Sequence, residues 1–236
     1  MKKLAIITGA NKGIGKETAL LLSENKCDLV LAARNERELK KVARECETAG
    51  AEVTIVAGDL TADCACVTLI QKAKAAAKDH YPVLINNAGM AEFGSFDQQP
   101  IDAFERHVAL NYMVGVRLCH EAVPWMLNNG GGQIINVLSI AADHPFSGAA
   151  AYCSSKAAMR MFSKVLAQEY RARGLRVTSL IPGSTDTALW DRVPVKPESR
   201  DMMRPAAVAE AIRDIVLSPK DRNIDEYVLM PPNGIL

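Results

Sequence analysis

Aromatic residues, net charge and long apolar runs are all scarce in this chain of 236 residues. Phe, Trp and Tyr make up 5% of the sequence, so its 49% hydrophobic content is mostly aliphatic, as in strands buried on both faces of a sheet. The formal net charge is +1 and like charges form no long run. The sequence therefore gives no indication of a nucleic-acid partner.

Features of metal-binding, secreted and membrane proteins are also missing. The six cysteines are scattered along the chain, at Cys27, Cys46, Cys64, Cys66, Cys119 and Cys153. Cys64 and Cys66 have no second Cys or His pair at zinc-ligand spacing, so we expect free thiols, a reducing compartment and no bound metal. The apolar run at 4–8 is too short for a signal peptide or a membrane span. We therefore expect a cytoplasmic protein without a membrane partner.

Short apolar runs alternate with longer segments whose apolar residues have helical spacing. The runs are 4–8, 29–33, 53–57, 83–86, 134–138, 177–181 and 227–230, and the helical segments are 13–25, 35–49, 61–79, 101–128, 152–173 and 205–217. This alternation predicts one α/β domain over 1–236, a Rossmann fold with a seven-stranded parallel sheet, doubly wound with helices on both faces. Thr61 is the expected N-cap of the third helix, and Pro205 suits the start of the last one.

One segment fits neither pattern. Residues 184–204 contain two prolines and mixed polarity. A loop of this length in a compact domain is usually functional. We interpret it as a lid over a substrate.

A glycine-rich turn, "TGANKGIG", follows the first expected strand and opens the first expected helix. Gly9, Gly13 and Gly15 would let backbone amides and the helix N-terminus approach a pyrophosphate. Glycines in such a turn can also serve tight packing alone. The strand, turn and helix context favours the phosphate interpretation.

The end of the second expected strand bears on the choice of dinucleotide. NAD-binding folds usually place an acidic residue there, whereas a 2′-phosphate requires a cation. This chain has Ala33 followed by Arg34, and Lys12 in the glycine turn could reach the same phosphate. Either cation alone could be an ordinary surface residue. Together they favour NADP over NAD.

The stretch "YCSSK" places Tyr152 and Lys156 four residues apart on an expected helix, and hence on one face. A neighbouring ammonium favours the phenolate, so we expect it to lower the tyrosine pKa from its ordinary value of about 10. The pair is a candidate acid and base. The alternative is a half-buried tyrosine beside a solvated lysine.

Other polar residues follow the expected strands. Asp59 comes after the third, the stretch 86–89 ("NNAG") after the fourth and Ser139 after the fifth, while Asn111 lies in a long helical segment. Carboxyl ends of strands line one crevice in open α/β sheets. Each residue also has a structural alternative: turn formation for Asp59 and 86–89, capping for Ser139, and a backbone hydrogen bond for Asn111.

The ordered motifs together resemble the short-chain dehydrogenase/reductase family along essentially the whole chain. They are TGxxxGxG at 8–15, NNAG at 86–89, Asn111, Ser139, Tyr152-x-x-x-Lys156 and "PGSTDT" at 182–187. The resemblance implies an NADP(H)-dependent oxidoreductase that transfers hydride between nicotinamide and a C=O or CH–OH group. One departure is Leu138, which stands where the family usually has a first serine before the catalytic one.

The resemblance also implies roles for individual residues. Tyr152 would protonate the carbonyl oxygen and Ser139 would hydrogen-bond to it. Lys156 would lower the tyrosine pKa and bind the nicotinamide ribose, and Asn111 would support a proton-relay water. Implied cofactor contacts are Gly9, Asn11, Lys12, Gly13, Ile14, Gly15, Arg34, Asp59, Leu60, Asn87, Ala88, Gly89, Tyr152, Lys156, Pro182, Gly183, Thr185 and Thr187; implied substrate contacts are Ser139, Tyr152 and Trp190.

The substrate is less well defined. The loop 140–151 and the expected lid, with Leu189, Trp190, Val193, Met202 and Met203, offer a mainly apolar wall, unless these residues only pack the lid onto the body. The ending "DEYVLMPP" favours sepiapterin reductase-like members and a small or apolar ketone, diketone or pterin side chain. A 3-oxoacyl-acyl-carrier-protein reductase is the alternative, although 127–133 lacks the expected basic residues. A non-catalytic NADP-binding sensor would have no need of the intact catalytic residues.

Association with further copies is expected as well. Family members are usually homodimers or homotetramers formed through the helices at 101–128 and 152–173. Candidate contacts are Val116, Leu118, Val123, Met159, Phe162 and Val165, although core packing could explain them. Cys153 is expected to pack or, if exposed, to be sensitive to oxidation.

Overall fold

The computed structural model describes residues 1–193 and 197–235. Seven strands form one parallel sheet in the order β3-β2-β1-β4-β5-β6-β7. They are β1 (Lys3–Thr8), β2 (Asp28–Ala33), β3 (Val53–Ala57), β4 (Tyr81–Asn86), β5 (Gly132–Val137), β6 (Leu175–Pro182) and β7 (Glu226–Leu229). The predicted Rossmann fold, with a seven-stranded parallel sheet in one domain, is confirmed.

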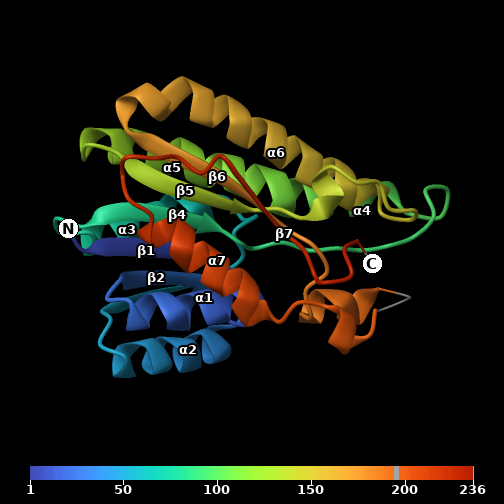
Figure 1. The fold of residues 1–236 in the computed structure, drawn as a ribbon, viewed down its shortest axis with the longest axis horizontal. Helices are drawn as coiled ribbons and strands as arrows, with labels where there is room; N and C mark the ends of the chain where they lie inside the picture. Colours follow the sequence, from blue (N-terminus) through green and yellow to red (C-terminus); the bar gives the residue numbers. More distant parts are fainter. Residues whose placement is uncertain (194–196, 236) are drawn as a thin grey trace.

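Helices cover both faces of this sheet (Figure 1). They are α1 (Gly13–Glu24), α2 (Glu36–Thr48), α3 (Ala65–Ala76), α4 (Ile101–His107), α5 (Val114–Asn128), α6 (Ala150–Tyr170) and α7 (Pro205–Leu217). Helices α1, α2 and α7 pack on one face, and α3, α5 and α6 pack on the other. Pro205 opens α7 as the sequence predicts.

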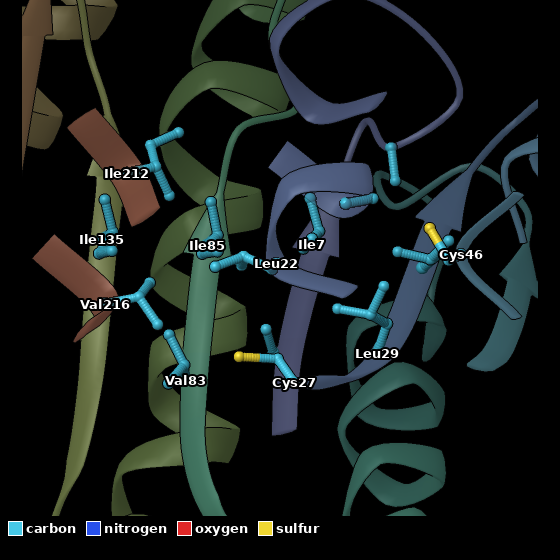
Figure 2. Packing of buried hydrophobic residues seen from close by; sticks show 14 of the residues in the cluster. Ile7, Leu22, Cys27, Leu29, Cys46, Val83, Ile85, Ile135, Ile212 and Val216 are labelled. Atoms are coloured by element: carbon cyan, nitrogen blue, oxygen red, sulfur yellow. The ribbon is translucent and has the colours of Figure 1, made fainter. Parts of the chain in front are cut away.

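Alternate residues of the central strands supply two separate hydrophobic cores. In β1, Ile7 belongs to the core beneath α1 and α7, whereas Ile6 belongs to the core beneath α3 and α5. This follows from the two-residue period of a strand. Figure 2 shows the first core, with Ile7 and Ile85 of neighbouring strands beside Leu22 of α1. Burial of each such side chain contributes about 1.5–3 kcal/mol, so both faces hold the sheet in place.

The expected N-cap of the third helix is wrong. Helix α3 begins at Ala65, and Cys64, in the left-handed conformation with φ of 60°, is its N-cap. Thr61 instead donates hydrogen bonds from its amide (2.9 Å) and hydroxyl (2.8 Å) to Asp59 Oδ1. The Asp59 carboxylate therefore closes a turn that delays the helix.

The long helix expected at 101–128 is interrupted. A wider π-helical turn, Val108–Met113, separates α4 from α5. Asn111 lies in this turn, and its carboxamide accepts a hydrogen bond from Met90 N (2.9 Å) and donates one to Met90 O (3.0 Å). Such turns are frequent at functional sites. The spacing of apolar residues alone does not reveal it.

Part of the oligomer surface expected from the sequence is occupied within the chain. Leu118, Val123 and Met159 are buried in hydrophobic clusters of the same protomer, so they are not available to a partner. Val165 on α6 is exposed. Assembly into a homodimer or homotetramer stays a prediction.

The segment 184–204 begins and ends close together. Thr185 pairs with Met203 in an isolated bridge, and Met203 N donates to Ser184 O at 3.0 Å. Met203 packs into the core beneath α7, and Met202 is also buried. Two short 3₁₀ turns, Ala188–Arg192 and Ser199–Asp201, lie between these ends. Residues 194–196 of the expected lid lie outside the described residues.

No helix in residues 1–193 and 197–235 combines the length and the apolar character needed to cross a bilayer.

The amino ends of the first four strands meet around one buried carboxylate. Asp28, whose side chain is 4% exposed, lies 2.7 Å from Lys2 Nζ and 2.9 Å from His80 Nε2. It also accepts a hydrogen bond from Glu52 N at 2.9 Å. Burial alone would raise the pKa of Asp28, but the hydrogen bonds from Lys2 and Glu52 and the charges of Lys2 and His80 outweigh it and lower the pKa. The ionised carboxylate therefore stabilises the fold.

We expect Asp28→Asn to lower the free energy of unfolding at pH 7 by about 2 kcal/mol, because it removes a buried, multiply bonded charge. The folded-state pKa lies below the unfolded value of about 3.9, so the stabilisation is present above that value and disappears as the pH falls through the lowered one. Urea denaturation from pH 7 to pH 2 measures it. Glu36→Gln, in an exposed pair with Lys40, is the control and should change little. A deficit of Asp28→Asn that stayed constant into strong acid would contradict the assignment.

Candidate active site

A cavity of about 980 Å³ lies at the carboxyl ends of the strands. Its lining comes from the segments that follow β1 through β6. Strand order reverses between β1 and β4, which is where ligands bind in open α/β sheets. The single crevice expected from the sequence is therefore present.

Nearly every residue expected at the site lines this cavity. They are Gly9, Asn11, Lys12, Gly13, Ile14, Arg34, Asp59, Leu60, Asn87, Ala88, Gly89, Ser139, Tyr152, Lys156, Pro182, Gly183, Thr185, Thr187 and Trp190. Leu189 and Val193 of the expected apolar wall line it too, whereas Met202 and Met203 do not. Gly15 and Asn111 also lie outside the lining.

Gly15 has a packing role. A Cβ atom at this position would lie 2.4 Å from Gly9 O and 2.7 Å from Asn87 Nδ2. Real Cβ atoms essentially never come so close, so only glycine lets α1 begin directly against the turn. At Gly15 the geometry therefore supports the alternative interpretation of the turn glycines, in which glycine is needed for tight packing.

The turns after β1 and β4 are tied together by Thr8. Its buried hydroxyl accepts hydrogen bonds from Asn87 N (3.0 Å) and Ala88 N (2.9 Å). Asn87 Nδ2 donates to Thr8 O at 2.9 Å. The "TG" of the first motif and the "NA" of the second thus form one rigid wall of the cavity.

Two cations lie at the end of the cavity near β2. Lys12 and Arg34 are both exposed, and Ala33 occupies the position where an acidic residue would repel a 2′-phosphate. Hydrogen bonds from the Thr61 amide and hydroxyl, with the charge of Arg34, hold the pKa of Asp59 below its usual range. Asp59 therefore forms a turn, as its structural alternative proposed, and lines the cavity as well.

At the other end Ser139, Tyr152 and Lys156 converge. Tyr152 and Lys156 are on α6, and Ser139 follows β5. Lys156 Nζ donates to Val137 O at 3.0 Å and lies 5.9 Å from the centre of the Tyr152 ring. Ser139 Oγ accepts a hydrogen bond from Ala141 N at 3.2 Å, and its hydroxyl is close enough to Tyr152 to act on the pKa of the phenol. Both members of the Tyr–Lys pair are buried.

The direction of the tyrosine pKa differs from the expectation. Burial raises the pKa of Tyr152 to about 12, and the hydrogen bond from Ser139 opposes this rise only in part. Burial also lowers the pKa of Lys156 to about 8. Desolvation disfavours the charged form of each group. The protein surroundings thus keep Tyr152 protonated at neutral pH.

Asn111 lies behind these residues. Besides its two hydrogen bonds to Met90, its Nδ2 donates to Ser155 Oγ at 3.0 Å. The side chain is thus bonded mainly to the backbone, as its structural alternative proposed. Asn111 and Lys156 line a second cavity of about 10 Å³, which is roughly the space of one water molecule.

Residues 3–197 match the short chain dehydrogenase family. The chain belongs to this family. An uncharacterized oxidoreductase of Staphylococcus saprophyticus is 32% identical over an alignment of 245 positions, gaps included, that covers 99% of this chain and 98% of that protein.

Two solved structures share the fold over nearly the whole chain. An alcohol dehydrogenase from the archaeon Thermococcus sibiricus, complexed with 5-hydroxy-NADP, has a TM-score of 0.89 and 26% identity, covering 97% of this chain and 96% of that one. A 7α-hydroxysteroid dehydrogenase complexed with NADH and 7-oxo glycochenodeoxycholic acid has a TM-score of 0.89 and 27% identity, covering 99% of this chain and 94% of that one. The chain is thus a short chain oxidoreductase with a Rossmann fold.

Sequence reasoning missed one part of the cavity. The segment 93–95 lines it, together with Arg106 of α4. The segment directly follows "NNAG" at the carboxyl end of β4, so its position in the chain could have singled it out. It carries no motif of its own.

Within residues 1–193 and 197–235, no three His, Cys, Asp or Glu side chains are grouped as a metal site.

Proposed function

We propose that this protein is an NADP(H)-dependent oxidoreductase that interconverts a small or apolar ketone, diketone or pterin side chain and the corresponding alcohol. One observation carries the proposal: a single cavity joins Ser139, Tyr152 and Lys156 at one end to a glycine turn and two cations at the other. The family membership supports the reaction class. The neighbour bound to 5-hydroxy-NADP supports the choice of dinucleotide.

The residues present fit a dinucleotide. Gly9, with φ of 68°, has a backbone conformation that suits glycine, and a Cβ there would lie tightly against Asn87 Nδ2, at 3.0 Å. The turn would hold the pyrophosphate at the N-terminus of α1, and Lys12 and Arg34 would hold the 2′-phosphate. Asp59 and Leu60 would contact the adenine, the stretch 87–89 the adjoining ribose and 182–187 the nicotinamide. When bound, NADP(H) supplies the hydride.

Four side chains of the protein have the other roles in the reaction. Tyr152, kept protonated by burial, gives its proton to the carbonyl oxygen during reduction. The Ser139 hydroxyl hydrogen-bonds the same oxygen as it gains charge. Lys156, fixed by Val137 O, places an ammonium near the phenolate that Tyr152 becomes, and it binds the nicotinamide ribose. Asn111 lies behind Lys156 and lines the small cavity, which would hold a relay water.

The segment 184–204 acts as the substrate lid of the domain in this proposal. Trp190 Nε1 donates to Thr185 O at 2.9 Å, which anchors the 3₁₀ turn that carries Trp190 and Leu189. Both side chains line the cavity, so the turn presents an apolar surface to a substrate.

Fluorescence titration with NADPH and NADH, followed by turnover of diketones, sepiapterin and an acetoacetyl thioester, tests the proposal. We expect tighter binding of NADPH and its oxidation by diketones or sepiapterin. Turnover of the thioester alone would support a 3-oxoacyl-thioester reductase instead. Tight NADPH binding without turnover of any carbonyl compound would support a non-catalytic sensor.

A further inference from the structure

Phe93 lies beside the tyrosine at the reactive end of the cavity. Its ring centre is 6.3 Å from that of Tyr152, and the ring planes are inclined by 37°. Both rings belong to one apolar cluster, which also includes Ala91, Phe146 and Leu189. Phe93 lines the cavity, so a substrate whose carbonyl oxygen reached the Ser139 and Tyr152 hydroxyls would lie against it.

The segment that carries Phe93 has no regular secondary structure, yet its backbone is fixed. Met90 is bonded through both N and O to Asn111. Glu92 N donates to His107 Nε2 at 3.0 Å, and Glu92 O accepts from Gln99 Nε2 at 3.2 Å. His107 is completely buried, so the amide of Glu92, directly before Phe93, is held by the core.

A second attachment comes from the loop after β5. Gly94 N donates to Gly148 O at 2.8 Å, directly after Phe93. Gly148 has φ of 76°, a conformation that suits glycine, and this brings its loop against Gly94. The same loop carries Phe146, which also lines the cavity. Two segments far apart in the sequence thus form one aromatic wall.

The Tyr152 ring is held from a further side. The His107 ring centre lies 6.4 Å from that of Tyr152 at 70°, an edge-to-face arrangement. His107 therefore fixes both Tyr152, by ring contact, and the segment before Phe93, by its hydrogen bond to Glu92. The distance between Phe93 and Tyr152 is set by these contacts, and a substrate has to fit the space as it is.

We infer that Phe93 determines substrate specificity by selecting ketones whose carbonyl group carries a flat apolar ring. This inference rests on the proposed function and adds the substrate class to it. A planar ring can stack against a fixed phenyl face, a contact that contributes beyond its buried area. A puckered saturated ring of the same skeleton is thicker, and the wall cannot retreat to admit it.

Acetophenone and cyclohexyl methyl ketone are matched probes, since they share a carbon skeleton and differ in ring planarity. Their dissociation constants would be measured by NMR titration of the protein, with and without NADP⁺, alongside NADPH oxidation. We expect wild type to bind acetophenone about tenfold more tightly than the saturated ketone. Phe93→Leu keeps an apolar side chain without a flat face and should bring the ratio near one.

Phe96→Leu is the matched control, because Phe96 is an exposed phenylalanine of the same segment and does not line the cavity. It should leave the ratio unchanged, and unaltered circular dichroism would show that both variants fold. Equal binding of the two ketones by wild type, or a ratio that Phe93→Leu leaves intact, overturns the inference. If the ratio depends on Phe93 but neither these ketones nor the diketones and sepiapterin are reduced, the proposed function is overturned and Phe93 selects flat rings in binding alone.

Discussion

Tyr152→Phe is expected to lower kcat for ketone reduction by about 10³-fold, because the substitution removes the proton donor and leaves the ring. The phenyl ring keeps its contacts with Phe93 and His107, so the cavity retains its shape. The loss should therefore appear in kcat, while the dissociation constant of NADPH changes by about tenfold at most, in line with loss of one neutral hydrogen bond. Steady-state kinetics and fluorescence titration on the same preparations measure the two quantities.

Tyr112→Phe provides the matched control for this experiment. Tyr112 packs edge-to-face on Phe162, with ring centres 6.3 Å apart, and does not line the cavity. Its loss of a hydroxyl should leave kcat within about twofold, since no transition-state contact is removed. If Tyr152→Phe retained more than about a tenth of the wild-type kcat, another group would have to donate the proton.

Arg34→Asp is expected to reverse the choice of dinucleotide. Replacing the cation by a carboxylate removes a charge-assisted contact of about 1.5–3 kcal/mol and adds repulsion, so the dissociation constant of NADPH should rise about 100-fold. The new carboxylate lies directly after β2, one residue beyond the usual acidic position, from where it can accept a hydrogen bond from a ribose hydroxyl. NADH binding should therefore stay the same or tighten. Titration with both dinucleotides at two salt concentrations measures the change.

Arg37→Asp makes the same change of charge at an exposed position in the first turn of α2, outside the cavity lining. It reports the effect of net charge alone, which we expect to be small and equal for both dinucleotides because exposed charges are screened by salt. An Arg34→Asp variant that weakened NADH and NADPH equally would show that Arg34 does not contact a 2′-phosphate. Lys12 would then be the remaining candidate for that role.

Much of this molecule could be predicted from local patterns. The seven strands and the start of α7 at Pro205 follow from apolar spacing and helix-start signals, which act within a few residues. The glycine turn and the Tyr152–Lys156 pair are equally local. The turn follows the carboxyl end of β1 and the pair lies in α6, the helix after β5; the carboxyl ends of parallel strands share one edge of a sheet. For these reasons the sequence indicated both the fold and most of the cavity lining.

Other features depend on packing between distant segments. The pKa of Tyr152 rises because α6 buries the phenol, an effect that the spacing to Lys156 does not contain. Gly15 serves packing because Gly9 and Asn87 lie against it. Thr61 forms a turn with Asp59, although it looks like a helix cap. For Tyr152 and Gly15 the residues that matter are distant in the chain. For Thr61, a turn with Asp59 competes with the expected helix cap.

The sequence by itself determined the strands, the glycine turn proposed to bind phosphate and the residues proposed to react, because each is specified by a short pattern that carries its own physical reason. Only the tertiary structure decided which side chains lie next to Tyr152 and whether its phenol is protonated. The hydrogen bond from Gly94 to Gly148 joins segments that no local pattern relates, and burial depends on every element around the ring. Contacts and desolvation of this kind are properties of the packed chain.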